Sequence, residues 1–211
     1  MKTHLILLAL ICSFAFPAGA AETPKPPCCA PSQPAAAPCC AELKSAAPLP
    51  TRSLYQLETN WTTDAGATLP LASLRGQPVL IAMFFAQCEY ACPMLVADLQ
   101  RVRSSLPAEV RARTRIVLAS FDTVRDTPAA LRAYRERLKL DDAWTLLRGE
   151  TTAVQELAML LGVKFKQEAT GQFAHSNLIT LLTVDGEVAH QRQGLQGDVS
   201  ELARAVEIAA K

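Results

Sequence analysis

Residues 79–102 read VLIAMFFAQCEYACPMLVADLQRV, an apolar run followed by a stretch in which apolar side chains recur with helical spacing. The run from Val79 to Phe85 follows the breaker Gly76-Gln77-Pro78 and has the length of a buried central strand. Beyond it, apolar residues recur at spacings of 4, 3 and 4, at Leu95, Leu99, Val102 and Leu106. That spacing marks one face of a helix, which Pro93 could begin and Pro107 ends. The stretch predicts a buried strand that leads directly into a helix.

Strand and helix signals alternate through the rest of Thr51 to Lys211. Ser53 to Trp61 is predicted to be extended, and further strands are predicted over Ile116–Phe121, Trp144–Leu147, Leu178–Val184 and Glu187–His190. The last two strands form a hairpin, because Asp185-Gly186 is a two-residue turn signal.

Three further helices have start signals, at Thr127-Pro128, at the capping-box pair Thr152 and Gln155 with Gly162 as the stop, and at Asp198 with Glu201. The resulting order of strands and helices implies parallel crossovers followed by an antiparallel hairpin. It predicts an α/β fold with a central mixed sheet sandwiched by helices and an N-terminal β extension.

Residues 1–20 have the features of a secretory signal peptide. Lys2 gives a positive start, Leu5 to Phe16 is apolar apart from Ser13, and Ala18-Gly19-Ala20 matches the small-x-small cleavage pattern. The apolar segment is shorter than the ~20 residues that span a bilayer. We therefore predict cleavage after residue 20 and export to the periplasm, an oxidising compartment. The alternative is an inner-membrane anchor facing the periplasm.

Residues 21–50 hold eight of the fourteen prolines and almost no large apolar side chains, which is typical of an extended, flexible linker. They also carry two vicinal pairs, Cys28-Cys29 and Cys39-Cys40. Paired thiolates select soft metals such as Cu(I) or Zn(II), so one interpretation is a tail that collects metal. The other is a tail whose cysteines form disulfides or have no role.

The charge balance excludes one class of function. The chain has 21 Lys plus Arg against 20 Asp plus Glu, a net charge of +1, and loss of Lys2 with the signal peptide would leave it formally neutral. Such a chain has no positive field with which to hold a polyanion. We therefore expect no nucleic-acid partner.

Two cysteines, Cys88 and Cys92, lie where the predicted strand meets its helix. Open α/β sheets place their sites at the carboxyl ends of parallel strands, and a helix N-terminus favours thiolates. Both cysteines are therefore expected to be reactive. Residues four apart on a helical turn have Cβ atoms ~5–6 Å apart, from which small adjustments allow either a disulfide or two thiolates on one metal. The spacing alone does not choose between them.

Only three histidines occur, at His4, His175 and His190. His175 precedes the predicted strand that begins at Leu178, and the segment entering that strand of a thioredoxin-like sheet passes beside the redox loop. Thioredoxins place a cis-proline there, but Pro128 is the last proline of this chain. Two thiols with one imidazole make His175 the candidate third metal ligand. His190 is predicted on the outer strand of the hairpin and is not a candidate.

The chain resembles the Sco/SenC family of copper-binding, thioredoxin-fold proteins. The matching parts are the C-x-x-x-C-P motif at 88–93, the segment FDTVRDTP at 121–128, and the isolated His175. The resemblance implies a thioredoxin-like domain over residues 51–211, with copper bound by Cys88, Cys92 and His175. It also implies a membrane-proximal chaperone, not spanning the membrane after cleavage, for the binuclear copper centre of cytochrome c oxidase. Asp122, Arg125 and Asp126 match a family signature loop without being ligands.

Three positions depart from the family pattern. Glu89, Thr123 and Ala174 stand where family members often have Pro, Pro and Asp. Glu89 places a carboxylate beside the thiols, which should raise their pKa. Ala174 removes a carboxylate that could orient His175.

Two classes of function follow from the motif. In the first, copper is passed by ligand exchange to the copper-bearing subunit of cytochrome c oxidase or to another periplasmic copper or thiol client, and the protein is expected to be a monomer. In the second, the protein is a thiol-disulfide oxidoreductase in which Cys88 and Cys92 reduce client cysteines without need of His175. A peroxidase-like thiol is disfavoured by the second motif cysteine, and zinc storage by the lack of a fourth ligand.

Overall fold

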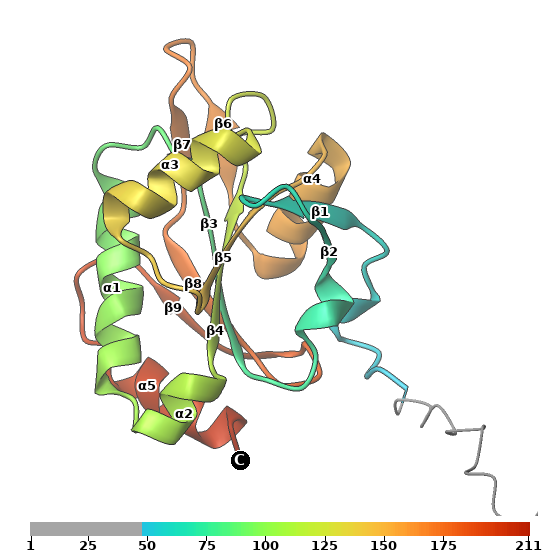
Figure 1. Ribbon diagram of the computed structural model, residues 1–211, viewed down its shortest axis with the longest axis vertical. Helices are drawn as coiled ribbons and strands as arrows, with labels where there is room; N and C mark the ends of the chain where they lie inside the picture. Colours follow the sequence, from blue (N-terminus) through green and yellow to red (C-terminus); the bar gives the residue numbers. More distant parts are fainter. Residues whose placement is uncertain (1–47) are drawn as a thin grey trace, which may run out of the picture. The chain divides into compact units, whose positions relative to one another are not determined.

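A seven-stranded mixed sheet forms the centre of the computed structural model, which describes residues 48–211 (Figure 1). Its strand order is β2-β1-β5-β4-β3-β8-β9. The bounds are β1 Asn60–Thr63, β2 Thr68–Pro70, β3 Val79–Phe84, β4 Arg115–Ser120, β5 Trp144–Arg148, β8 Leu178–Leu182 and β9 Val188–Gln193. The pairs β3–β4 and β4–β5 are parallel, and the remaining pairs are antiparallel. The predicted mixed sheet is confirmed.

Helices cover both faces of this sheet. They are α1 Ala91–Ser105, α2 Ala108–Arg113, α3 Pro128–Leu138, α4 Thr151–Leu161 and α5 Ser200–Ala209, with 3-10 turns η1 Leu54–Gln56 and η2 Leu71–Leu74. Right-handed crossovers from β3 to β4 and from β4 to β5 place α1 and α3 on the same face, where α5 packs against α1 (Figure 1). The chain then turns back across the sheet to β8, so α4 covers the opposite face (Figure 1).

The core lies around β3, all six residues of which are buried. A strand covered by helices on both faces has no solvent side, so its sequence reads as a continuous apolar run. Leu95, Leu99 and Val102 of α1 are fully buried in the same core, as their spacing predicts. The helix begins at Ala91, two residues before Pro93, and ends at Ser105.

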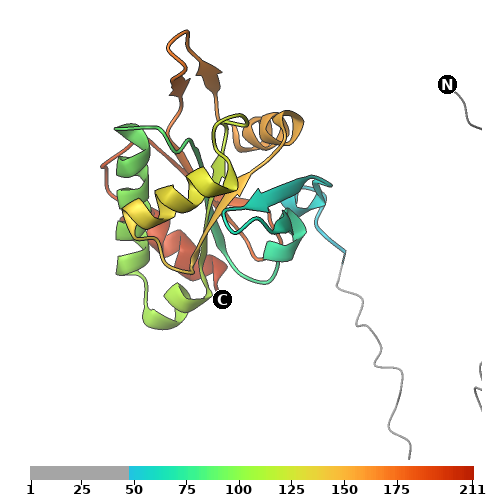
Figure 2. The same ribbon diagram turned by 45° about the horizontal axis from the view of Figure 1, so that its top comes forward.

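A second sheet has only two strands, β6 Phe165–Gln167 and β7 Phe173–His175. This hairpin lies between α4 and β8 in the chain and projects beyond the main sheet (Figures 1 and 2). Sequence patterns did not predict it, nor the short elements β2 and α2.

Several sequence predictions of local structure are wrong. Ser53 to Trp61 is not one extended segment, because the Ser53 hydroxyl accepts the amide of Tyr55 and begins the η1 turn, and the strand starts only at Asn60. The capping box of Thr152 and Gln155 is absent as well. The N-cap of helix α4 is Glu150, two residues before Thr152, and no side chain caps the helix.

The turn between β8 and β9 is longer than predicted. The Thr183 amide donates to the Glu187 carbonyl at 2.9 Å, so three residues rather than two form the loop. Gly186 adopts φ +85°, and a Cβ there would lie 2.6 Å from the Tyr55 ring. Glycine is required by both the backbone conformation and the close approach. Asp198 was expected to begin the last helix. Its carboxylate accepts the Ser200 amide, but the helix starts at Ser200 and its N-cap is Val199.

Some predictions fall on residues 1–47 and lie outside the described residues. They are the signal peptide of residues 1–20 and most of the linker, including the pairs Cys28-Cys29 and Cys39-Cys40. Within residues 48–211, no helix is both long enough and apolar enough to cross a membrane.

Candidate metal centre

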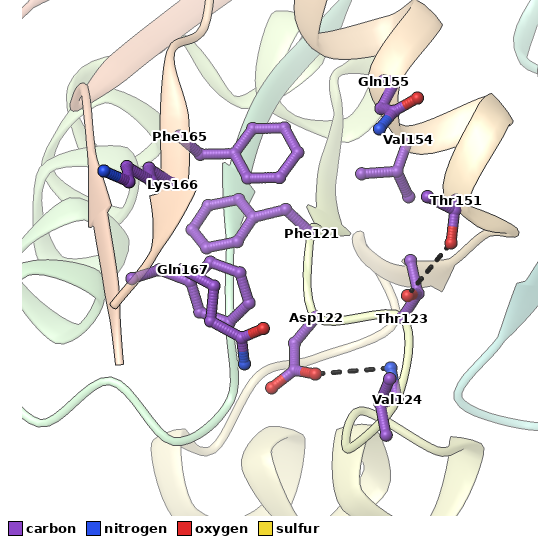
Figure 3. A pocket seen from close by; sticks show the side chains of 11 residues that line it. Phe121, Asp122, Thr123, Val124, Thr151, Val154, Gln155, Phe165, Lys166 and Gln167 are labelled. Carbon is purple, nitrogen blue, oxygen red and sulfur yellow. Dashed lines mark hydrogen bonds between the residues drawn. The ribbon is translucent and has the colours of Figure 1, made fainter. Parts of the chain in front are cut away.

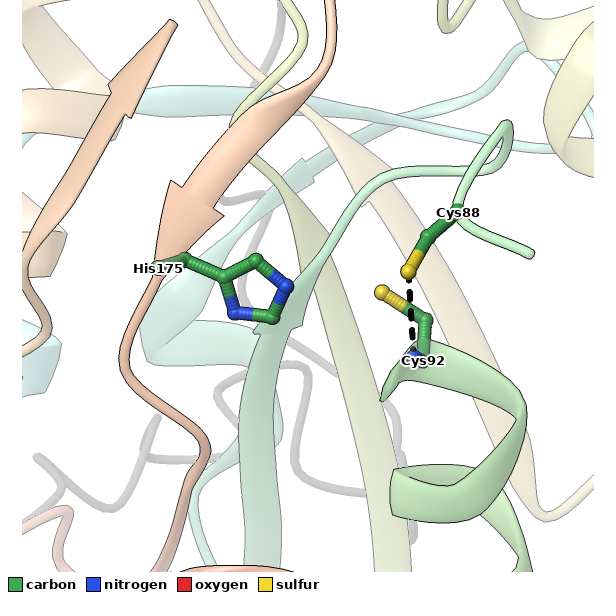
Figure 4. A group of neighbouring side chains, drawn as sticks. All are labelled: Cys88, Cys92 and His175. Carbon is green, nitrogen blue, oxygen red and sulfur yellow. Dashed lines mark hydrogen bonds between the residues drawn. The ribbon is translucent and has the colours of Figure 1, made fainter. Parts of the chain in front are cut away.

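Cys88 and Cys92 lie where the carboxyl end of β3 passes into α1, as predicted. The Cys92 amide, at the start of the helix, donates to the Cys88 sulfur at 3.2 Å (Figure 4). Both cysteines are free thiols. Cys88 is 8% exposed and Cys92 is fully buried, so the two sulfurs differ in their access to solvent although they are adjacent.

His175 is the last residue of β7, and the hairpin brings its ring to the two sulfurs. One donor atom from each of Cys88, Cys92 and His175 lies within 4.8 Å of the other two. The ring nitrogen Nδ1 contacts the Ser176 carbonyl at 3.2 Å. A carbonyl only accepts, so Nδ1 is the donor in this contact, and Nε2 is the ring nitrogen that faces the sulfurs (Figure 4).

The contact with Ser176 also fixes the ring orientation of His175. A backbone carbonyl on the remote nitrogen is one of the usual partners of a metal-ligating histidine. It takes the place of the side-chain carboxylate that Ala174 cannot provide.

Two phenylalanines contact the imidazole, and a third packs against both of them. The His175 ring lies 5.1 Å from the Phe121 ring and 6.1 Å, edge-on, from the Phe85 ring. Phe173 contacts both of these rings, at 5.0 and 5.2 Å between centroids. An apolar wall of this kind limits the approach of water to the site and strengthens charge interactions inside it.

The pKa values of the two thiols are shifted in opposite directions. The pKa of Cys88 is lowered to about 4, first because the Cys92 side chain hydrogen-bonds to its sulfur and further because His175 and the amides of Cys92 and Tyr90 do so, while burial opposes the shift. The hydrogen bond to Cys88 and burial raise the pKa of Cys92. The lowered pKa expected for both thiols is therefore found for Cys88 only. The prediction that Glu89 raises the thiol pKa is wrong for Cys88, whose pKa is lowered although the exposed Glu89 is its chain neighbour.

Residues 85–90, between β3 and α1, form a loop that carries Cys88 and is here called the cysteine loop. Asp126 supports this loop from the inside of the protein. Its carboxylate accepts the Ala86 amide at 2.9 Å and the Ser120 hydroxyl at 2.5 Å. The side chain is fully buried, and burial raises the pKa of Asp126. The carboxylate thereby joins the residues before Cys88 to the end of β4.

Cys88 is reached from two sides. One cavity is lined by Gln87, Glu89 and Arg137, and the other by Tyr90, Gln172 and His175, with Cys88 in the wall of both. A third cavity is lined by Phe121, Asp122 and Phe165 (Figure 3) and contains none of the three donors. His190 lies on β9, paired with Leu181, and is not part of the cluster.

The fold and the donor set together define a class: a thioredoxin-like α/β domain that carries two cysteines and a histidine at the carboxyl end of a central strand. The sequence model of the SCO1/SenC family matches residues 51–211. The chain belongs to the SCO1/SenC family.

Individual relatives agree with this assignment. The chain is 30% identical over 131 residues to a protein of Stutzerimonas stutzeri named "Putative copper-binding protein", an alignment that covers 60% of this chain and 63% of that protein. The chain therefore spans less than two thirds of that relative.

Solved structures with lower identity share the fold. The copper-bound ScoI of Arabidopsis thaliana is 17% identical, with a TM-score of 0.62 over 72% of this chain and 94% of that one. The structure of BsSco is 23% identical, with a TM-score of 0.62 over 72% and 90%. BsSco is described as a member of the Sco family of cytochrome c oxidase assembly proteins with a disulfide switch.

Proposed function

We propose that this protein is a copper metallochaperone in which Cys88, Cys92 and His175 hold one copper ion. The observation that carries the proposal is the convergence of two sulfurs and one ring nitrogen within 4.8 Å of one another. Cu(I) prefers thiolate and imidazole donors, and a site with few donors leaves a face open to an incoming ligand. The relative named for copper binding and the copper-bound ScoI support this choice of metal.

Zinc fits the same donors less well. A structural zinc site normally takes four protein ligands. The donor cluster found within residues 48–211 has three members, all in the apolar setting described above. Three donors match the low coordination number of Cu(I) better than the tetrahedron of Zn(II).

Copper transfer would proceed by ligand exchange at Cys88. This sulfur lies at the wall of both cavities, whereas Cys92 is fully buried, so a client ligand meets Cys88 first. The client is the copper-bearing subunit of cytochrome c oxidase, or else another periplasmic protein with copper or thiol ligands. The description of BsSco supports the first choice, and the signal-like segment of residues 1–20 supports the periplasm.

A second function, thiol-disulfide exchange, is favoured by the asymmetry of the cysteines. A thiolate with a pKa of about 4 beside a buried partner thiol suits attack by Cys88 and resolution by Cys92. Cys88 would bond to one client sulfur and release the other as a thiolate. Cys92 would then displace the client, leaving a Cys88–Cys92 disulfide and two reduced client thiols, with both electrons passed to the client.

The two functions are separated by single substitutions in the full chain with Cys28, Cys29, Cys39 and Cys40 replaced by serine, here called the tail-serine background. In this background the parent should bind one Cu(I) per chain. Cys88→Ser and Cys92→Ser should lose it, and His175→Ala should bind it more weakly. Copper content after dialysis and competition with a Cu(I) chelator measure the binding, and reduction of a model disulfide is measured on the same samples.

His190→Ala is the matched control, because His190 lies outside the donor cluster. It should bind copper as the parent does. If His175→Ala binds copper normally while disulfide reduction follows the cysteines, the oxidoreductase function replaces the chaperone.

A further inference from the structure

Arg125 links two segments that are far apart in sequence. It lies in the loop between β4 and α3, and its guanidinium forms an ion pair with Asp122 in the same loop. The other end of the guanidinium donates to the Gly171 carbonyl at the tip of the β6–β7 hairpin. The same group lies over the Phe173 ring, 5.8 Å from its centroid. One side chain thus contacts the hairpin that carries His175 at two points.

The Asp122 end of this link is fixed to the core. Asp122 is 2% exposed, and its amide donates to the Ser120 hydroxyl at 2.9 Å. Its carboxylate also accepts the Arg125 amide at 3.0 Å. Ser120 is the last residue of β4 and bonds the buried Asp126. The guanidinium is therefore held by a buried carboxylate in a loop whose backbone is bonded to the end of β4.

Apart from Arg125, the hairpin is held by the rings of Phe165 and Phe173, which pack on Phe121. Its two strands pair over three positions, and Lys166, Gln167 and Ala174 are exposed. The tip turns at Gly171, where φ is +80° and a Cβ would lie 3.3 Å from the Arg125 guanidinium. The close approach of Arg125 to the backbone is possible there because the residue is glycine.

We propose that Arg125 is a positioning residue for the metal site: it clamps the hairpin to the end of β4 and so holds the His175 ring at the sulfurs. This inference rests on the proposed copper function but can be tested apart from it. Lysine should not replace Arg125, because a single ammonium cannot bind Asp122 and the Gly171 carbonyl in the fork geometry of a guanidinium.

The first test uses the metal-free tail-serine protein and its Arg125→Gln variant. In Arg125→Gln, the amide of Glu168, which donates to the Gln172 carbonyl in the hairpin turn, should exchange with solvent about ten-fold faster. The His175 ring-proton shifts should move toward their values in an unfolded chain, because the ring leaves the Phe121 ring. Gly171→Ala should produce the same changes from the other end of the clamp. Arg132→Gln, an exposed arginine on α3, is the matched control.

The second test measures Cu(I) affinity by chelator competition. Loss of a group that orients a ligand typically costs 10–100-fold in metal affinity, and we expect a loss of this size in both Arg125→Gln and Arg125→Lys. The double variant Arg125→Gln/His175→Ala should bind no more weakly than His175→Ala alone, since both changes remove the same donor.

Three results would count against the clamp: hairpin exchange and His175 shifts in Arg125→Gln equal to those of the parent, losses of affinity that add in the double variant, or full affinity in Arg125→Lys. If the parent itself binds no copper, the proposed function fails. The metal-free measurements then still decide whether Arg125 positions His175.

Discussion

The cysteine loop and the β6–β7 hairpin both contribute residues to the site, but the fold holds the loop more firmly than the hairpin. The loop follows a strand with every residue buried, and Asp126 holds it from within the core. The hairpin has three-residue strands with mostly half-buried or exposed side chains, and it projects beyond the main sheet (Figure 2). The sulfurs are therefore fixed by the fold as a whole, whereas the position of the imidazole depends on a few contacts at its end of the molecule.

The largest expected effect concerns the cysteine loop. The Cys88 thiolate should form with a midpoint near pH 4 in the reduced, metal-free tail-serine protein, compared with about 8.5 for a free cysteine. Its first cause is Cys92 rather than His175, so His175→Ala should raise the midpoint only part of the way. Thiolate absorbance at 240 nm against pH measures it, with Cys88→Ser as the blank. A midpoint near 8.5 would show that the loop does not stabilise the thiolate.

The same shift makes stability depend on pH. Between about pH 4 and pH 8.5 the folded protein binds fewer protons at Cys88 than the unfolded chain does, so this contribution to the free energy of unfolding rises with pH. It is fully present above the unfolded pKa and is lost as the pH falls through 4. Urea unfolding of the parent and of Cys88→Ser at pH 5 and pH 8 should show a smaller pH dependence in the variant.

A core substitution and a hairpin substitution should differ in the unfolding free energy that they cost and in how much of the fold they loosen. Leu118→Ala removes a fully buried side chain from the centre of β4 and should cost about 2–5 kcal/mol of unfolding free energy. Phe165→Ala removes a half-buried ring that stacks on Phe121 at 5.1 Å and should cost about 1–2 kcal/mol. Hydrogen exchange should show global loosening in the first and loosening of the hairpin alone in the second. Equal and global effects would mean that the hairpin is part of the core.

His175→Ala tests how unequal the donors are. The sulfurs stay in place without the ring, so Cu(I) binding should weaken on the order of 100-fold, about 2.7 kcal/mol, rather than vanish. Cys92→Ser should abolish it, because that sulfur lies at the buried centre of the site. Chelator competition in the tail-serine background measures both. If His175→Ala loses all copper and Cys92→Ser keeps it, the sulfur is not the more important donor.

The smallest effect concerns helix starts on either side of the sheet. The Thr127 hydroxyl accepts the Ala130 amide at 3.3 Å and caps α3, so Thr127→Ala should lower the unfolding free energy by about 1 kcal/mol. Thr152→Ala should change it by less than about 0.5 kcal/mol, because Thr152 is exposed and caps nothing. Thermal and urea unfolding decide between the two threonines. A larger loss at Thr152 would restore the capping box that the sequence suggested.

Sequence patterns predict the inner part of this molecule well because burial on both faces leaves a clear signal. The run Val79 to Phe85 predicts a central strand. The spacing of the apolar residues in α1 predicts a helix that packs on the core. The hairpin left no such signal, since Phe165-Lys166-Gln167 is short and mostly exposed. A turn glycine at 171 between two phenylalanine-bearing segments was the one available hint.

The candidate site also has features that the sequence predicts and features that it does not. The residue types Cys88, Cys92 and His175 were named from motif and topology, and the structure brings them together. The opposite pKa shifts of the two thiols were not predictable, because they depend on the depth of each sulfur and on which hydrogen bond it receives. The contact of Arg125 with Gly171, 46 residues away, is likewise a product of tertiary packing.

X-ray absorption at the copper edge tests the central claim most directly. Cu(I)-loaded tail-serine protein should show two sulfur ligands and one histidine nitrogen, and the nitrogen should disappear in His175→Ala while both sulfurs remain. A copper environment of sulfur alone, identical in the parent and in His175→Ala, would contradict the assignment of His175 as a ligand and the account of the site built on it.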